Sequence, residues 1–171
     1  MATGRGTKLT SAVGEFLVAA ELCRRNLVAT PFSGNVPHYD IIASGDKGGH
    51  LAVQVKTING PNWQFDVSRF VEVALDGERQ TLGKARPEPY PGLRLVLVVL
   101  GKEGGRDRFF VLTWSELRDV VVAGYRDYLA KHGGVRPRAP KSFHVSLSVA
   151  EVVRFENQWQ TLLDALPRDS S

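Results

Sequence analysis

The sequence lacks several features that would place it in common protein classes. Its 171 residues include one cysteine, Cys23, which excludes an internal disulfide and a cysteine-based zinc site. Cys23 lies in an apolar helical pattern, so we expect it to be buried as a small hydrophobic residue. There is no run of about 18 apolar residues, which a membrane-spanning helix would need. The polar residues 1–8 also lack the apolar core of a signal peptide, so we expect a cytoplasmic protein.

The signatures of several common catalytic sites are absent as well. Gly104-Gly105 is not followed by the Gly-Lys-Ser/Thr of a phosphate-binding loop, and neither a Gly-x-Ser-x-Gly motif nor a kinase motif occurs. The four histidines form no closely spaced metal-binding pair; they are His38, His50, His132 and His144. P-loop nucleotide hydrolases, serine hydrolases with that elbow and protein kinases are therefore disfavoured.

The composition that remains is typical of one globular domain. Apolar residues make up 43% and charged residues 23%, which is ordinary usage for a chain able to bury a full core. The formal net charge is +4 and the isoelectric point is about 9.4. This small positive excess permits a polyanionic partner such as nucleic acid without requiring one.

The most informative stretch is Val36–Thr57. Two apolar runs, Tyr39–Ala43 and Leu51–Thr57, flank a turn rich in glycine at 45–49, and this pattern predicts a β-hairpin. Alternation along the second run places Gln54 and Lys56 on one strand face and the valines on the other. Asp40 lies at the start of the partner strand, and His38 is expected to share its face. An acid, an amide oxygen and a nearby lysine suit a hard cation and a phosphate.

Upstream, residues 10–27 predict a helix with Thr10 as a plausible N-cap. Glu15 lies two turns before Leu22 on an apolar face. A carboxylate in that position needs a partner or a metal ion. The alternative is a glutamate stabilised by the positive end of the helix dipole. Glu21 is on the other side, where we expect it to pair with Arg24 and Arg25.

Together, Glu15, Asp40 and the Gln54-x-Lys56 strand resemble the core of the PD-(D/E)XK nuclease superfamily, with most similarity to Holliday-junction resolvases and Mrr-like endonucleases. The resemblance covers residues 10–58, about a third of the chain. It departs from the usual pattern in two places. The Pro-Asp pair is stretched to Pro37-His38-Tyr39-Asp40, and Gln54 replaces the usual acidic residue, as in Mrr-like members.

This resemblance implies a metal-dependent endonuclease. Asp40, Gln54 and the Val55 carbonyl would hold Mg²⁺ or Mn²⁺, Glu15 would add a further contact, and Lys56 would orient the attacking water. The substrate would be nucleic acid, DNA in preference to RNA, and a homodimer is an option by analogy. The neutral Gln54 and the modest charge keep an alternative open, a catalytically inactive nuclease-fold module that binds nucleic acid or a protein.

Two other segments are basic. We expect residues 76–92 to form a long loop with Arg79, Lys84 and Arg86 in its middle. Residues 135–141 carry Arg136, Arg138 and Lys141 between prolines. These six residues are candidates for contacts to nucleic-acid phosphates, and the alternative is that they form solvated surface.

The remaining pattern predicts the fold class. Strands are expected at 26–32, 63–67, 93–100, 108–112 and 143–147, helices at 113–131 and 148–166, and either a strand or a short helix at 70–75. This order predicts an α+β domain, a mixed β-sheet flanked by helices with a restriction-endonuclease-like core. We expect a flexible basic arm at 1–9, a single domain at 10–167 and a tail at 168–171. Trp63, Trp114 and Trp159 are expected in the core.

Overall fold

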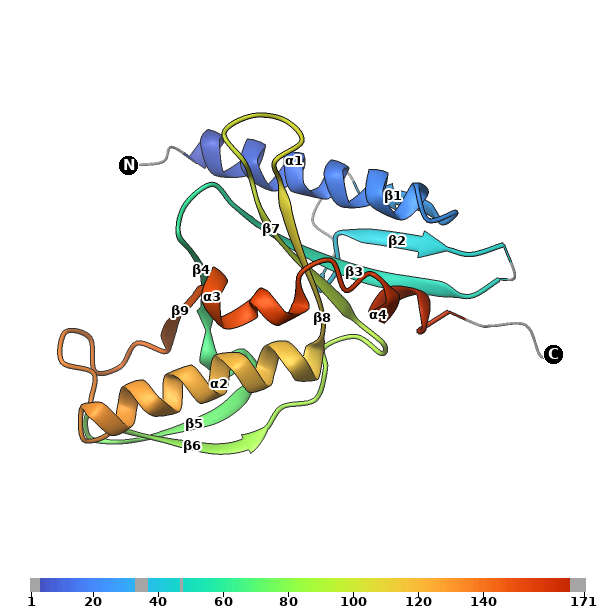
Figure 1. Cartoon of the computed structure of the whole chain (residues 1–171). Helices are drawn as coiled ribbons and strands as arrows, with labels where there is room; N and C mark the ends of the chain where they lie inside the picture. The colour runs from blue at the N-terminus through green and yellow to red at the C-terminus, as the bar shows by residue number, and fades with distance from the viewer. Residues whose placement is uncertain (1–3, 33–36, 47, 167–171) are drawn as a thin grey trace.

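A five-stranded mixed sheet forms the centre of the protein in the computed structural model, which describes residues 4–32, 37–46 and 48–166. The strand order is β1-β2-β3-β7-β8, as Figure 1 shows. All neighbours are antiparallel except β3 and β7, which are parallel. The strands are β1 (Val28–Pro31), β2 (Ile41–Ser44), β3 (His50–Ile58), β7 (Arg94–Val99) and β8 (Arg108–Thr113). The mixed sheet and the hairpin β2–β3 confirm the predicted α+β class with a mixed β-sheet.

Helices cover both faces of this sheet (Figure 1). The helix α1 (Gly4–Cys23) packs Val18 and Leu22 against Val53 and Val55 of β3. On the other face, α2 (Trp114–Lys131) packs Leu117 and other apolar side chains against the β7–β8 hairpin. Strand β7 reads as a continuous apolar run because it is buried on both faces. The capping box of Thr113 and Glu116, predicted from the sequence, is present at the start of α2.

Two small antiparallel sheets complete the α2 side. One pairs β4 (Asn62–Asp66) with β9 (His144–Ser148), and the other pairs β5 (Val71–Asp76) with β6 (Arg79–Ala85). A short 3₁₀ helix, η1 (Val67–Arg69), links β4 to β5. Trp63, Trp114 and Trp159 are all buried, as expected. No helix in the described ranges is both long enough and apolar enough to span a membrane.

The structure corrects the expected start of the first helix. It begins at Gly4, so residues 4–9 are helical rather than part of a flexible arm, and residues 1–3 lie outside the described chain. Thr10 is an interior helical residue whose hydroxyl donates to the Gly6 carbonyl one turn earlier. Extending a helix that packing has already nucleated adds one hydrogen bond per residue, so no cap at Thr10 is needed.

The expected loop over 76–92 is also wrong. Its first half is the second strand of the β5–β6 hairpin, and only residues 86–92 connect to β7. The two-residue turn is Gly77-Glu78, and Gly77 has φ of +60°, a conformation that glycine adopts without steric strain. This dipeptide is a hairpin signal, which the charged residues around it obscured.

The expected helix over 148–166 is broken. It comprises α3 (Val149–Val152), a 3₁₀ helix η2 (Val153–Phe155) and α4 (Gln160–Leu163). Glu156 instead pairs with Phe110 of β8, and Asn157 has φ of +56°. The break lets Trp159 and Leu162 pack with the α1 side of the sheet, while Val152 and Phe155 pack with the α2 side. Pro167 and the tail lie outside the described residues.

Cys23 is exposed at the end of α1 rather than buried. The apolar residues of α1 fall on two faces, and the sheet covers only the one that contains Val18 and Leu22. Val13 and Phe16 on the other face are 46% and 67% exposed. The expected pairing of Glu21 with Arg24 and Arg25 is confirmed, with distances of 2.6 and 2.7 Å.

Candidate functional site

Asp40 is fixed where the pairing of β2 with β3 ends. Its backbone N–H donates to the Val53 carbonyl at 2.9 Å, and its carbonyl accepts from the Phe32 N–H at 3.0 Å. Its carboxylate oxygen Oδ2 accepts from the Val55 N–H at 2.7 Å. The Asp40 carboxylate therefore accepts the hydrogen bond that a further β2 residue would accept from β3. This charge-assisted hydrogen bond orients the carboxylate.

The Val55 carbonyl points to the same side of β3 as Asp40. In an extended strand the N–H and the C=O of one residue face the same neighbour, and the Val55 N–H donates to Asp40. The regular register of β2 with β3 ends at Ile41 and Val53, so β2 does not continue alongside Val55. One carbonyl oxygen and one carboxylate thus lie at the open edge of β3.

Glu15 comes to this edge from α1. Its neighbour Gly14 allows the helix to approach β3 very closely, because a Cβ on Gly14 would lie 1.8 Å from Thr57 Oγ1. The pKa of the Glu15 carboxyl is raised from its ordinary value, first by burial and then by the negative charge of Asp40, whereas the positive charge of Lys56 opposes this. The two carboxylates and the lysine are therefore close enough to interact electrostatically.

These groups line one cavity of about 350 Å³. Glu15 reaches it from the α1 face of the sheet, and Lys56 reaches it from β3, where Lys56 alternates with the valines that face α1. The two can meet because β2 does not cover this part of the β3 edge. The cavity is lined by Glu15, Asp40, Val55 and Lys56 together with Thr7, Ser11, Thr57, Ile58, Asn62, Trp63 and Gln64.

Lys56 is held through its backbone rather than through its side chain. The buried Trp63 donates its indole N–H to the Lys56 carbonyl at 2.9 Å. In the described part of the chain, no ion pair or hydrogen bond engages the Lys56 ammonium. The ammonium is therefore available to an anionic ligand in the cavity, while its strand position is fixed.

Gln54 does not line the same cavity. It borders a second one, of about 410 Å³, which is also lined by Pro37, His38, Arg69, Pro89 and Trp114. The Gln54 amide nitrogen donates to the His38 carbonyl at 3.1 Å. His38 has φ of +77° and lies before β2, so the expectation that it shares a strand face with Asp40 is wrong. Its backbone carbonyl, rather than its ring, contacts Gln54.

The donors at the first cavity suit a hard cation. The described residues contain no group of three or more His, Cys, Asp or Glu side chains placed to bind a metal. The cavity instead offers the carboxylates of Glu15 and Asp40. Val55 also lines it, and the Val55 carbonyl lies on the same side of β3 as Asp40. Mg²⁺ is bound through one or two carboxylates and keeps several waters, so this oxygen set fits it. Burial, and after it the negative charge of Asp40, raise the pKa of Glu15, and a cation bound beside both carboxylates would oppose this effect.

The six basic candidates do not gather at these cavities. Arg79, Lys84, Arg86, Arg138 and Lys141 are exposed, and none of the six lines either cavity. Arg136 has a structural role: its guanidinium lies 5.6 and 5.3 Å from the ring centroids of Tyr125 and Tyr128 and donates to the His144 carbonyl. For Arg136, the predicted phosphate contact is therefore disfavoured.

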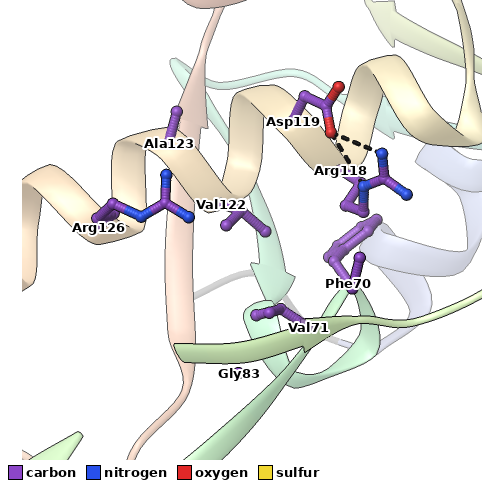
Figure 2. A pocket seen from close by; sticks show the side chains of 9 residues that line it. Phe70, Val71, Gly83, Arg118, Asp119, Val122, Ala123 and Arg126 are labelled. Atoms are coloured by element: carbon purple, nitrogen blue, oxygen red, sulfur yellow. Dashed lines mark hydrogen bonds and ion pairs between the residues drawn. The ribbon is translucent and has the colours of Figure 1, made fainter. Parts of the chain in front are cut away.

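Another hollow lies away from the candidate site, between α2 and the β5–β6 hairpin. Figure 2 shows Arg118 and Arg126 of α2 on one side of it and Val71 and Gly83 on the other. Arg118 pairs with Asp119 at 2.9 Å, which neutralises part of the positive charge. This hollow holds none of the four candidate catalytic residues.

The sequence patterns missed several residues that shape the site. Gly14, Thr57 and Trp63 set the approach of α1 and the position of Lys56, and Arg69 borders the Gln54 cavity. The glycine beside Glu15 was a usable signal, since glycine within a helix often marks close packing. Nothing local to Trp63 or Arg69 indicates their distant partners.

Comparisons with known proteins give little direct guidance. No known protein family matches the sequence, and no curated protein matches it. The chain is similar to the solved structure of a bacterial homing endonuclease, with 14% sequence identity, a TM-score of 0.49, and coverage of 92% of this chain and 93% of the other. A similarity of this size does not establish a shared function.

Proposed function

We propose that this protein is a metal-dependent nuclease that hydrolyses DNA phosphodiester bonds, with Glu15, Asp40, Gln54 and Lys56 at its active site. One observation carries the proposal. Two carboxylates and an unpaired ammonium, supplied by α1, by the segment before β2 and by β3, line a single cavity. Glu15 and Asp40 are both partly buried, and one ammonium balances only one of the two carboxylates. The arrangement therefore favours an added cation, and with it a function, over a purely structural role.

In this proposal Asp40, Glu15 and the Val55 carbonyl hold Mg²⁺ or Mn²⁺. The Gln54 amide nitrogen donates to the His38 carbonyl, which leaves the amide oxygen, at the neighbouring cavity, as a further metal ligand. When bound, the metal would lower the pKa of a coordinated water and polarise the phosphate. The metal set resembles that of PD-(D/E)XK enzymes, with a neutral amide in place of one acid.

Lys56 would act on the substrate rather than on the ion. Its ammonium would lie beside the phosphate, neutralise the charge that develops during attack, and orient the attacking water. The hydrogen bond from Trp63 to the Lys56 carbonyl fixes the strand at this residue. Because the position is preorganised, the lysine would need little rearrangement as the reaction proceeds.

The test is cleavage of purified plasmid, branched and single-stranded DNA in the presence of Mn²⁺. The wild type should cut at least one of these DNAs, and Lys56→Ala should cut it at least about a hundredfold more slowly. Lys102→Ala removes an exposed lysine of the turn between β7 and β8 and is the matched control. Cleavage that persists at the wild-type rate in Lys56→Ala would point to a contaminating nuclease and remove the proposal.

A second candidate is an inactive nuclease-fold module that binds nucleic acid or a protein. Two observations favour it: Gln54 is neutral, and its side chain borders a different cavity from Asp40. This candidate predicts that wild type and Lys56→Ala are equally inactive on every DNA tested with Mn²⁺. Binding without cleavage would then be the protein's activity.

A further inference from the structure

The cavity beside Gln54 is lined mainly by groups that donate hydrogen bonds. Arg69 contributes a guanidinium, Gln54 an amide and Trp114 an indole, while Pro37 and Pro89 form apolar walls. No aspartate or glutamate lines this cavity. A cavity that offers donors and a positive charge, without an acidic group, suits an anionic ligand rather than a metal ion.

Arg69 is available for such a ligand. Its side chain is exposed, and no carboxylate in the described ranges pairs with it. Its backbone is fixed on both sides: the Asp66 carboxylate accepts from the Ser68 N–H at 2.9 Å, and Phe70 stacks on Trp114 with ring centroids 4.7 Å apart. A guanidinium on an anchored turn binds a phosphate with a smaller entropy cost than one on a mobile loop.

Trp114 gives an independent indication. It is 7% exposed, and its indole nitrogen is buried without a hydrogen-bond partner among the described residues. An unsatisfied buried donor costs about 1–3 kcal/mol. Because the nitrogen itself is covered, a ligand oxygen in the cavity can accept from this N–H only after a shift of the Trp114 side chain, and that contact would remove the cost.

The cavity also lies at the right place relative to the candidate catalytic lysine. Gln54 and Lys56 are two residues apart on β3, which corresponds to about 6.6 Å along a strand. This is the length scale of one nucleotide along a DNA strand. A phosphate in the Gln54 cavity would therefore be next to the phosphate that Lys56 contacts.

We infer that this cavity is a subsite for the DNA phosphate adjacent to the one that is cleaved, with Arg69 as the phosphate-binding residue. The inference rests on the proposed function, because the adjacent phosphate is defined by the phosphate that the nuclease would cleave. Arg69 would pair with the phosphate oxygens, Trp114 would donate its indole N–H, and Gln54 would border this subsite. In this arrangement the subsite positions the strand and does not take part in bond cleavage.

Binding is measured first, without metal, so that the result does not depend on catalysis. A short fluorescein-labelled single-stranded DNA is titrated in EDTA at several salt concentrations. Arg69→Ala should bind about five- to tenfold more weakly, and the slope of log affinity against log salt should fall by about 0.7. Arg69→Lys keeps the charge and should restore part of the affinity. Arg106→Ala, at an exposed arginine of the turn between β7 and β8 that lines neither cavity, is the control.

The second readout is the Trp114 indole N–H, followed by NMR on tryptophan-labelled protein and assigned with Trp114→Phe. Its signal should shift on saturation with the unlabelled DNA, while the Trp63 indole, already bonded to Lys56, should shift less. The inference is overturned if Arg69→Ala binds the DNA as tightly as the wild type, or if Arg106→Ala weakens binding as much as Arg69→Ala does. It is equally overturned if the Trp114 signal does not move in the saturated complex.

These outcomes are separate from those of the nuclease test. If DNA binding depends on Arg69 and shifts Trp114, but the wild type cleaves nothing with Mn²⁺, the phosphate subsite stands and the nuclease proposal fails. If the wild type cleaves and Lys56→Ala does not, while Arg69→Ala has unchanged binding and unchanged KM, the nuclease proposal stands and the subsite fails.

Discussion

Gly14 of α1 lies directly against Thr57 of β3. A Cβ on Gly14 would be 1.8 Å from Thr57 Oγ1 and 2.8 Å from Thr57 Cβ, which is closer than atoms can approach. The hydroxyl of Thr57 is itself buried without a hydrogen-bond partner in the described ranges. This contact sets how near α1 comes to the sheet, and it therefore sets the position of Glu15, the next residue in the helix.

Gly14→Ala should therefore destabilise the protein, although alanine is the better helix former. Forcing a methyl group into this contact should lower the free energy of unfolding by about 1–3 kcal/mol, measured by urea denaturation. Gly124→Ala makes the same change within α2, where the nearest atom to the new Cβ is the carboxylate end of Glu151 at 3.3 Å. That control should be neutral or gain up to about 1 kcal/mol. Equal effects of the two substitutions would contradict this account of the α1–β3 contact.

The raised pKa of Glu15 makes a prediction about stability and pH. The folded protein holds this proton to a higher pH than the unfolded chain, so the associated stabilisation is complete below the ordinary value of 4.5. It is lost as the pH rises through the folded pKa. Glu15→Gln removes this pH-dependent loss. The free energy of unfolding of the variant, relative to that of the wild type, should therefore be greater at about pH 7 than at about pH 4.

Urea denaturation in EDTA at both pH values measures this difference. Glu78→Gln, which removes a negative charge from the exposed β5–β6 turn, controls for the change in net charge. If the free energy of unfolding of Glu15→Gln differs from that of the wild type by the same amount at both pH values, the surroundings do not destabilise the charged carboxylate.

Metal binding should depend on Asp40 more than on Lys56. Asp40→Asn removes the proposed ligand charge and should weaken Mn²⁺ binding about tenfold or more, whereas Lys56→Ala should leave it nearly unchanged. Gln54→Glu should strengthen binding if the amide oxygen is a ligand, because a carboxylate binds hard cations more strongly. Titration calorimetry checks all three, with Asp127→Asn on the exposed side of α2 as control. No heat from the wild type, even with DNA present, would exclude the proposed metal site.

The pair of Arg108 and Glu156 joins β8 to the segment where the C-terminal helix breaks. The guanidinium donates to both carboxylate oxygens at 2.7 Å, and this hydrogen bonding lowers the pKa of Glu156. Its stabilisation is therefore present above the ordinary value of 4.5 and is lost as the pH falls through the folded pKa. The two side chains are 41% and 29% exposed, so solvent limits the effect to about 1 kcal/mol.

Glu156→Gln should accordingly lower stability at about pH 7 and have less effect at about pH 3, and added salt should reduce the difference. Glu103→Gln disrupts a longer ion pair, at 3.6 Å between side chains that are more than 70% exposed, and should have no measurable effect. Thermal denaturation of the three proteins across this pH range provides the measurement. If Glu156→Gln lowers stability as much at about pH 3 as at about pH 7, the packing of Glu156, rather than its charge, stabilises the fold.

Much of the fold follows from local sequence patterns. The two apolar runs on either side of 45–49 form the β2–β3 hairpin, Thr113 and Glu116 cap α2, and the continuous apolar run at 93–100 forms the central strand β7. In each case the residues that determine the structure are neighbours in the chain. Side-chain periodicity and capping are properties of such neighbours, so the sequence is sufficient to predict them.

Where local signals conflicted, tertiary contacts decided the outcome. Residues 148–166 have a helical pattern, yet Glu156 leaves the helix to pair with Phe110 and Arg108. Basic residues made 76–92 look like an exposed loop, yet residues 79–85 pair with β5. In both segments, contacts with partners distant in sequence stabilise the observed structure. These contacts outweigh the conformational preference of the segment alone.

The candidate site divides in the same way. The sequence by itself determined which chemical groups are available, because Glu15, Asp40, Gln54 and Lys56 stand out by type and spacing. Only the tertiary structure decided that Glu15, Asp40 and Lys56 line one cavity while Gln54 borders another with Arg69 and Trp114. The physical reason is that β2 ends before Val55 and that Gly14 admits α1 against Thr57. Both depend on contacts between segments that no local pattern encodes.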